Sequence, residues 1–461
     1  MKSLSIFGTS SDAGKSTLSF AITYLLHQRG IKVTPFKAQN VSNNSQVTDA
    51  GGEIAIPQAF AAQAIGLKTT PLMNPILLKS GGLSKAHLII NGKSFGDKDV
   101  WSYYRDMEVL KPHVKKAFKK LQKEYECIVA EGAGSPVELN LMDKDLSNIY
   151  VAKKFDTKII LVADIERGGV FASIYGVYKL LPKKLRNNII GVVINKFRGD
   201  MKLFDEGVDI IQSRLGIKVL GVIPYKPFNL GFEDSQSLMN YKQNTNKAII
   251  KVGVIHLPHI SNFTDFEPLV VDAEIELNFI KTPTQALNYD MLILPGSKRV
   301  VDDFLWLKQN GFEDILTSDK KMIFAICGGY EMMYEKLIDK KLTESKYQYV
   351  YGFGRFKGSV KFKAKKVVKK GCYRVFGIMT KAYEIHNGVT KKRNKRATNL
   401  YGTFLHGVFE NDEIRQKIFK EINPEYKGYC FDEFKSDAVS EFAKHIDNHL
   451  DIDYLVKSLD A

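Results

Sequence analysis

The alternation of short apolar runs with helical patterns is the feature of this 461-residue chain that most constrains its fold. Residues 4–7 are typical of a buried strand, and apolar residues then recur at helical spacing over residues 18–26. Similar strand-like runs follow at residues 127–130, 159–162, 189–194 and 219–223. Strands that alternate with helices predict an α/β fold with a mostly parallel, doubly wound sheet. The functional loops of such a sheet gather at the carboxyl ends of its strands.

A polar, Asn/Gln-rich stretch interrupts this pattern in the middle of the chain. Residues 233–247 have no apolar period, and we interpret them as a linker. A second series of strand-like runs follows at residues 249–257, 291–294, 323–326 and 401–405. The sequence therefore predicts two domains, residues 1–232 and residues 248–461, which agrees with the usual size of a single domain.

The composition is ordinary for a protein with an apolar core, at 44% hydrophobic and 26% charged residues. No run approaches the roughly 20 apolar residues that a membrane-spanning helix needs. The apolar stretch at the N-terminus is too short for a signal peptide, so the expected location is the cytoplasm. The four cysteines, Cys127, Cys327, Cys372 and Cys430, form no CxxC pair, which argues against a zinc site or a disulfide scaffold.

The net charge of +16 includes two basic stretches, residues 361–370 and 391–396. The simplest interpretation is a solvated, lysine-rich surface. The alternatives are nucleic acid or a substrate with several carboxylates. Because the sequence contains no nucleic-acid-binding module, the polyanionic small molecule is the preferred alternative.

A candidate phosphate loop, residues 8–17, lies between the first predicted strand and the first predicted helix. Glycine lets the backbone approach the phosphates, and the helix N-terminus adds N–H donors. We expect Lys15 to pair with the β- and γ-phosphates and Ser16 to ligate Mg²⁺. Five residues separate the two glycines, one more than in the strict motif. The expected nucleotide contacts are Gly8, Thr9, Asp12, Gly14, Lys15, Ser16, Thr17 and, at a later strand end, Asn195 near the adenine edge.

Two acidic residues follow predicted strands in this half of the chain. Glu131 and Asp164 are each candidates to hold Mg²⁺ or a water beside it, with helix capping as the alternative for each. Lys37 and Asn40 end the second predicted strand, where we expect them to face the substrate or the γ-phosphate.

A second motif places Cys327 after the apolar run 323–326 and before two glycines that open a helical pattern. This strand–nucleophile–helix turn presents a reactive side chain in hydrolases. A thiol at a helix N-terminus has a lowered pKa and is more nucleophilic. The sequence therefore predicts a cysteine nucleophile rather than a structural thiol.

Cysteine catalysis also needs a base and an oxyanion hole. His406, at the end of a predicted strand, is the favoured base, and His386 is its competitor. The N–H groups of Gly296 and Gly328 are candidates to hold the oxyanion of the tetrahedral intermediate.

Five further segments form ordered motifs: residues 36–40 (FKAQN), 73–79 (MNPILLK), 131–136 (EGAGSP), 163–173 (ADIERGGVFAS) and 194–200 (INKFRGD). Together they resemble the cobyric acid synthase family of cobalamin biosynthesis, and the similarity extends over nearly the whole chain. The resemblance implies a dethiobiotin-synthetase-like P-loop domain joined to a class I glutamine amidotransferase domain. The family nucleophile falls on Cys327 and its catalytic histidine on His406.

The resemblance also implies the reaction. Four peripheral carboxylates (b, d, e and g) of adenosylcobyrinic acid a,c-diamide are amidated in turn, each with one ATP, Mg²⁺ and one glutamine. The implied partner is a corrinoid polycarboxylate, with no nucleic acid and no membrane. Self-association into a homo-oligomer is left open.

Three positions depart from the expected pattern: Ala325 and Ala382 replace glycines, and Val408 stands where many triad amidotransferases have glutamate. The third member of the Cys–His site is therefore not predicted. One alternative function is cobyrinic acid a,c-diamide synthase. Another is a regulatory, partitioning-type ATPase with an inactive amidotransferase domain, although Ser10 replaces the extra lysine usual in such ATPases.

Overall fold

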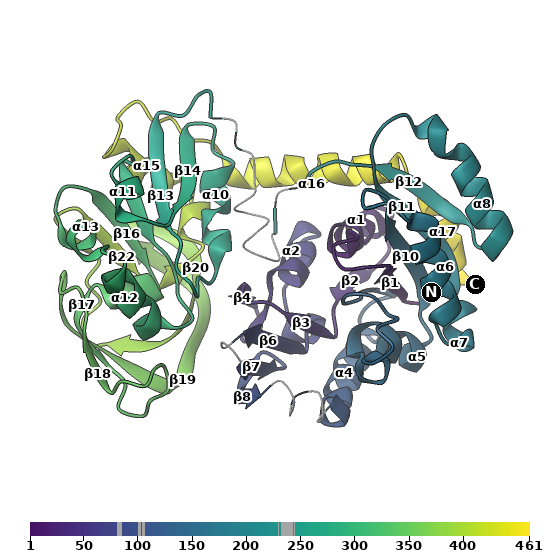
Figure 1. Ribbon diagram of the computed structural model, residues 1–461, viewed down its shortest axis with the longest axis horizontal. Helices are drawn as coiled ribbons and strands as arrows, with labels where there is room; N and C mark the ends of the chain where they lie inside the picture. The colour runs from purple at the N-terminus through teal and green to yellow at the C-terminus, as the bar shows by residue number, and fades with distance from the viewer. Residues whose placement is uncertain (81–84, 100–102, 104–106, 229, 232–242, 244) are drawn as a thin grey trace. The chain divides into compact units, whose positions relative to one another are not determined.

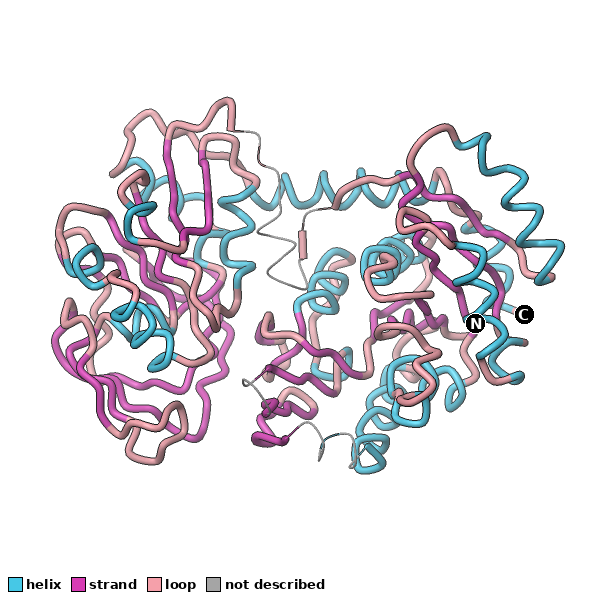
Figure 2. The backbone as a smooth tube through the Cα atoms, viewed as in Figure 1, coloured by secondary structure: helices cyan, strands magenta, loops and turns pink. Residues whose placement is uncertain are grey.

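The computed structural model describes residues 1–80, 85–99, 103, 107–228, 230–231, 243 and 245–461 (Figure 1). The chain divides into two compact units, each built from helices and strands (Figure 2). The first unit comprises Met1–Ser42, Thr48–Phe228 and Lys435–Ala461, and the second comprises Asn43–Val47 and Asn229–Phe434. The predicted linker, 233–247, lies mostly outside the described residues.

A six-stranded parallel sheet forms the centre of the first unit, in the order β12-β11-β10-β1-β9-β2. Its strands are β1 (Leu4–Gly8), β2 (Val33–Phe36), β9 (Cys127–Glu131), β10 (Lys158–Asp164), β11 (Ile189–Phe197) and β12 (Val219–Pro224). Both faces are apolar because side chains alternate along each strand: Ile6 packs in the core on one face and Phe7 in the core on the other. The predicted doubly wound α/β fold is confirmed.

Helices cover both faces of this sheet. On the Ile6 face, α1 (Lys15–Gln28) and α2 (Ile56–Ala64) contribute to the core. The Phe7 face and the β2 end are covered by α4 (Met107–Leu121), α5 (Val151–Phe155), α6 (Val170–Leu180), α7 (Lys183–Arg186) and α8 (Asp205–Leu215). A small second sheet has the order β3 (Gln39–Val41), β6 (Ile76–Ser80), β7 (Lys85–Ile90) and β8 (Lys93–Asp99).

The C-terminal segment belongs to the first unit, which differs from the predicted boundary of 248–461. Helix α16 (Phe431–Asp447) crosses from one unit to the other, and α17 (Ile452–Asp460) follows it. Phe442 and Leu455 pack with Ile22 in the core on the Ile6 face. Helical periodicity predicts an apolar stripe but does not say which sheet the stripe covers, so the sequence alone did not reveal this crossing.

The second unit contains two sheets. Its main sheet has the order β14 (Ile275–Ile280), β13 (Ile250–Ile255), β15 (Met291–Leu294), β16 (Met322–Ile326), β22 (Leu400–Thr403) and β21 (Arg396–Ala397), parallel except for β21. The other has the order β18 (Tyr349–Tyr351), β17 (Tyr334–Ile338), β19 (Phe356–Val375), β20 (Ile378–Thr390) and β23 (Leu405–His406). The single strand predicted at 401–405 is thus two strands in different sheets, β22 and β23.

Short helices connect the strands of the second unit. They are α10 (Glu267–Val270), α11 (Pro283–Ala286), α12 (Val300–Gln309), α13 (Glu313–Thr317), α14 (Gly328–Met332) and α15 (Asp412–Lys420). Strands β4 (Ser45–Val47) and β5 (Glu53–Ala55) belong to the second and first units, respectively. None of the described helices combines the length and apolar character needed to span a bilayer.

Candidate functional site

The predicted phosphate loop connects β1 to α1 in the first unit. Helix α1 begins at Lys15, directly after Gly14, whose φ of 93° is in the left-handed region. A Cβ atom on Gly14 would lie 2.1 Å from Nδ2 of Asn195, and this amide donates to the Ala13 carbonyl at 2.9 Å. Glycine is therefore required at this position, and Asn195 supports the loop from the end of β11.

The other predicted residues lie in the loop before α1 or in the first turn of α1. The Lys15 ammonium donates to the Ser10 carbonyl at 3.0 Å, and the Thr9 N–H donates to the Val162 carbonyl at 2.9 Å. Thr17 Oγ1 donates to the Gly14 carbonyl at 3.1 Å. The exposed Asp12 forms an ion pair with Arg167. These contacts hold the backbone of the loop around the N-terminus of a 14-residue helix, the arrangement that binds phosphate.

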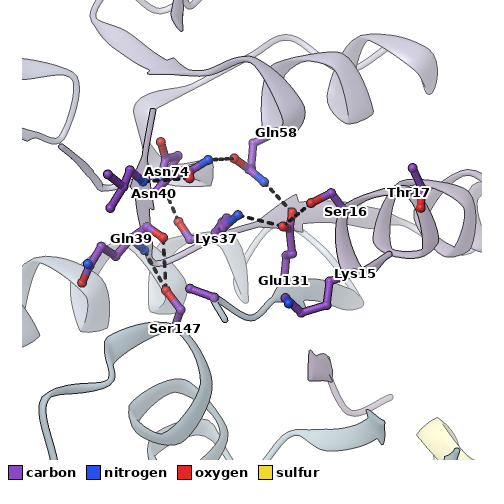
Figure 3. Close-up of polar contacts among 12 residues, drawn as sticks. Lys15, Ser16, Thr17, Lys37, Gln39, Asn40, Gln58, Asn74, Glu131 and Ser147 are labelled. Atoms are coloured by element: carbon purple, nitrogen blue, oxygen red, sulfur yellow. Dashed lines mark hydrogen bonds and ion pairs between the residues drawn. The ribbon is translucent and has the colours of Figure 1, made fainter. Parts of the chain in front are cut away.

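Glu131 is the centre of a buried polar cluster beside this loop (Figure 3). It is the last residue of β9, and its Oε1 accepts from Ser16 Oγ at 2.7 Å and from Lys37 Nζ at 2.7 Å. The side chains of Lys37 and Glu131 are 5% and 3% exposed, so this ion pair is shielded from water. The structure thus brings together three residues that the sequence assigned to metal and substrate binding.

The other predicted metal ligand, Asp164, has cationic partners. Its Oδ2 lies 3.0 Å from Lys196 Nζ and 3.7 Å from Arg167 Nε, while its Oδ1 accepts from the Glu166 N–H. Asp164 ends β10, the neighbour of β1 in the sheet. These contacts organise the loop at 164–167. Glu131 also has a cationic partner, Lys37, but its contact with the Ser16 hydroxyl places it directly beside the phosphate loop.

The residues around Ser16 suit a magnesium ion. Mg²⁺ prefers oxygen ligands, and in phosphate-loop enzymes it is held by a serine hydroxyl, one carboxylate and the phosphates. Ser16 Oγ and Glu131 Oε1 are such donors. Among the described residues, no group of three or more His, Cys, Asp or Glu side chains could hold a metal ion by itself.

Cys327 occupies a strained turn in the second unit, between β16 and α14. Its backbone angles, φ 50° and ψ −109°, are unusual for a residue with a side chain. The turn packs closely on the loop after β15, since a Cβ atom on Gly329 would lie 2.3 Å from the Leu294 carbonyl oxygen. The Cys327 N–H donates to the Thr403 carbonyl at 2.8 Å. The turn has the strand–turn–helix geometry expected of a nucleophile elbow.

His406 faces a carboxylate that the sequence did not predict. Its Nδ1 lies 2.7 Å from Asp265 Oδ2, and the other oxygen, Oδ1, accepts from the Gly407 N–H at 2.8 Å. Burial by itself lowers the pKa of His406, but Asp265 and Cys327 outweigh burial and raise it to about 10. The imidazole interacts with both partners, so Cys327, His406 and Asp265 form one buried constellation.

Asp265 lies in a short helical turn, Phe263–Phe266, which follows β13. Asn262 precedes the turn with a φ of 53°, and its amide donates to the Tyr383 hydroxyl at 3.1 Å. The Tyr383 ring stacks on His406, with ring centroids 5.3 Å apart. The signal available in the sequence was an acidic residue in the loop after a strand, where functional groups of parallel sheets gather.

The competing histidine, His386, has both ring nitrogens engaged elsewhere. Nε2 lies 2.9 Å from Glu384 Oε2, and Nδ1 lies 2.7 Å from the Gly388 carbonyl oxygen. Burial raises the pKa of Glu384, but His386 and Arg393 outweigh it and lower the pKa to about 2. His386 therefore forms part of an ion-pair network, which favours His406 as the base.

The two predicted oxyanion donors belong to the elbow, which contains Gly328, and to the loop after β15, which contains Gly296. A Cβ atom on Gly296 would lie 3.4 Å from His406 Cε1, and one on Gly328 would lie 2.7 Å from the Ser297 nitrogen. The N–H groups of Cys327 and Gly329 are already bonded to backbone carbonyls. Gly296 and Gly328 therefore remain the better candidates for the oxyanion hole.

A buried carboxyl group, Glu331, lies one helical turn after Cys327 and is only 1% exposed. Burial, with the nearby Cys327, raises its pKa well above the usual value for glutamate. The raised pKa favours the uncharged form of this carboxyl group beside the nucleophile. Sequence reasoning missed this residue.

Comparison with known proteins gives the same two-part organisation. Residues 4–230 match the CobQ/CobB/MinD/ParA nucleotide binding domain, and residues 251–414 match the CobB/CobQ-like glutamine amidotransferase domain. The chain is 49% identical to the cobyric acid synthase of Acinetobacter baylyi, over 100% of this chain and 99% of the relative. It is 38% identical to a probable cobyric acid synthase of Methanosarcina barkeri and 35% identical to the cobyric acid synthase of Clostridium perfringens, each over 98% of both chains.

The chain belongs to the cobyric acid synthase family. The resemblance predicted from the sequence is therefore confirmed. The three departures from the expected pattern are accommodated locally: Ala325, Ala382 and Val408 are all buried, at 0%, 4% and 2% exposure. Val408 cannot orient His406 as a glutamate would, and in this member of the family the contact to Nδ1 comes from Asp265.

Proposed function

We propose that the protein is a glutamine-hydrolysing, ATP-dependent amide synthase that converts adenosylcobyrinic acid a,c-diamide to adenosylcobyric acid by amidating its b, d, e and g carboxylates. The observation that supports this most is the buried Cys327–His406–Asp265 constellation in a chain similar over its whole length to cobyric acid synthases. An inactive amidotransferase domain would not require these three residues to be buried together.

Glutamine hydrolysis is the task of the second unit. His406 takes the thiol proton of Cys327, and the thiolate attacks the side-chain amide carbon of glutamine. The Gly296 and Gly328 N–H groups stabilise the oxyanion, and the His406 imidazolium gives its proton to the leaving ammonia. Water then attacks the γ-glutamyl thioester, which releases glutamate and restores the thiol. Asp265 holds the imidazole in the orientation and charge state that this sequence requires.

Carboxylate activation is the task of the first unit. A carboxylate is a poor electrophile at neutral pH, so a substrate oxygen first attacks the γ-phosphorus of ATP to give an acyl phosphate and ADP. Ammonia then attacks the acyl carbon, and phosphate leaves. Lys15 and the N-terminus of α1 bind the ATP phosphates, and Lys37 faces the transferred group. Ser16 and Glu131 would hold Mg²⁺, which supplies charge neutralisation at the phosphates when it is bound.

The proposed reaction is tested by mass spectrometry of the product that the purified protein forms from the a,c-diamide, ATP, Mg²⁺ and glutamine. We expect a product with four new amides. No conversion of the a,c-diamide, together with amidation of cobyrinic acid itself, would instead support an a,c-diamide synthase.

Replacement of Lys15 by alanine should remove amide synthesis from either nitrogen source. The ammonium group is buried at the N-terminus of α1, and its loss should lower the rate by at least about 10²-fold, as is typical for groups that stabilise transferred charge. The measurement is product formation with glutamine and, separately, with an ammonium salt. The exposed Lys153, in α5, provides the matched control as Lys153→Ala. An undiminished rate for Lys15→Ala would contradict the assignment of the loop.

A further inference from the structure

A chain of three amide groups leads to the carboxylate of Glu131 (Figure 3). The Val41 N–H donates to Asn40 Oδ1 at 2.8 Å, and Asn40 Nδ2 donates to Gln58 Oε1 at a longer 3.4 Å. Gln58 Nε2 then donates to Glu131 Oε2 at 2.9 Å. Gln58 is 3% exposed and lies in the first turn of α2. From this geometry we infer that Gln58 is a positioning residue, which fixes the carboxylate that faces the nucleotide's metal ion.

The groups at the two ends of this hydrogen-bonded series, the Val41 N–H and the Glu131 carboxylate, determine the direction of every hydrogen bond between them. A backbone N–H can only donate, so Asn40 must present its oxygen to Val41 and its NH₂ group to Gln58. An ionised carboxylate can only accept, so Gln58 must present its NH₂ group to Glu131. Both requirements give the same orientation of the Gln58 amide. A side chain of equal length without the NH₂ donor could fill the same space but could not donate a hydrogen bond to Glu131.

Asn74 links the backbone next to Gln58 to the backbone of Lys37, the other partner of Glu131. Asn74 donates through Nδ2 to the Lys37 carbonyl at 3.0 Å, and its Oδ1 accepts from the N–H of Ala55, which precedes α2, at 3.1 Å. The same amide also donates to the Ile76 carbonyl at 3.1 Å. A buried amide with all these contacts ties the start of α2 to the end of β2. The hydrogen bonds of Asn74 therefore fix the backbone position of Gln58 relative to Lys37.

The two oxygens of the Glu131 carboxylate therefore have different partners. Gln58 occupies Oε2, which leaves Oε1 as the oxygen that faces Ser16 and Lys37. Without the amide, Glu131 could rotate and exchange its oxygens, and the Lys37 ammonium could draw it away from Ser16. This inference rests on the proposed role of Ser16 and Glu131 in holding Mg²⁺. Partners that orient a ligand in this way typically change metal affinity by about 10–100-fold.

The test measures ADP binding by calorimetry for the unmodified full-length protein and for Gln58→Met. Each protein is measured once with Mg²⁺ and once with a chelator. Methionine keeps the length of the side chain but lacks the donor. We expect the gain in ADP affinity due to Mg²⁺ to fall about tenfold in Gln58→Met, with metal-free ADP affinity unchanged. Gln63→Met replaces an exposed glutamine of the same helix and should keep the wild-type gain. Asn40→Leu removes the donor to Gln58 Oε1 and should reduce the gain in the same direction, by less.

An unchanged Mg²⁺ effect in Gln58→Met would overturn the inference. Equal losses of ADP affinity with and without Mg²⁺ would also overturn it, because they would indicate a general packing role. Should Gln58→Met not fold, as judged by its thermal unfolding, Asn40→Leu provides the same comparison. The binding measurement does not involve the corrinoid substrate. Failure of the proposed reaction would appear in the product assay of the unmodified protein, and failure of this inference would appear only in the variants.

Discussion

Replacement of Cys327 by serine should abolish amide synthesis from glutamine and leave synthesis from ammonium salts nearly intact. Loss of a nucleophile in a catalytic constellation lowers the rate by roughly 10⁴-fold or more. Serine fits the elbow, but its hydroxyl is far harder to ionise than a thiol at neutral pH. The ATP-dependent steps use the other unit, so ammonia from solution should still react. The measurements are glutamate release and amide product from each nitrogen source.

The exposed Cys372 provides the control for this experiment. Cys372→Ser makes the same chemical change in the same unit, away from the elbow, and should retain both activities. Glutamine hydrolysis at the wild-type rate in Cys327→Ser would refute the nucleophile. Loss of the ammonium-dependent reaction as well would indicate that the substitution damages the fold rather than the glutaminase chemistry.

Replacement of Asp265 by asparagine should lower glutamine hydrolysis by about 10³–10⁴-fold, although the side chain keeps its shape. Asparagine can still accept from the Gly407 N–H through Oδ1, which turns its NH₂ group toward His406 Nδ1. The imidazole must then accept at Nδ1 and carry its proton on Nε2. This tautomer cannot take the thiol proton, so the base is lost while its position is preserved.

The pH profile distinguishes this effect from simple misfolding. Asp265 and Cys327 raise the pKa of His406 to about 10, so in the wild-type protein the imidazolium that protonates the leaving ammonia persists until the pH approaches that value. Removal of the Asp265 charge lowers the pKa of His406, because the cation loses its partner. The alkaline limb of kcat for glutamine hydrolysis should therefore move to lower pH in Asp265→Asn. Asp314→Asn removes an exposed carboxylate from the same unit and should not move it; an unshifted limb in Asp265→Asn would exclude the proposed role.

Several features could be predicted from the sequence because the residues that make them are contiguous. The phosphate loop and the cysteine elbow are each a strand, a turn and a helix within about 25 residues, and their glycines report close approach of the backbone. The structure places Lys15 and Ser16 at the first turn of α1 and Cys327 directly before α14, as expected. Strand existence was likewise predictable, since apolar runs of this length are buried in parallel sheets.

Contacts between distant parts of the chain were not predictable in this way. Asp265 and His406 are 141 residues apart, and the sequence drew attention only to Val408, two residues after His406, as the missing partner. The hydrogen bond between Gln58 and Glu131 spans 73 residues, and neither residue type signals the other. The sequence around a polar side chain in one loop does not indicate which strand end that side chain will contact in the fold.

The amino-acid sequence by itself determined the two α/β units, the phosphate loop, the cysteine elbow and the family, because local periodicity, glycine spacing and ordered motifs are properties of short segments. The tertiary structure alone decided that His406 rather than His386 pairs with Asp265, that Glu131 gathers Ser16, Lys37 and Gln58, and that α17 packs in the first unit. These outcomes depend on which buried polar groups and apolar stripes satisfy one another across the fold. That matching is settled only when desolvation forces each buried group to have a partner.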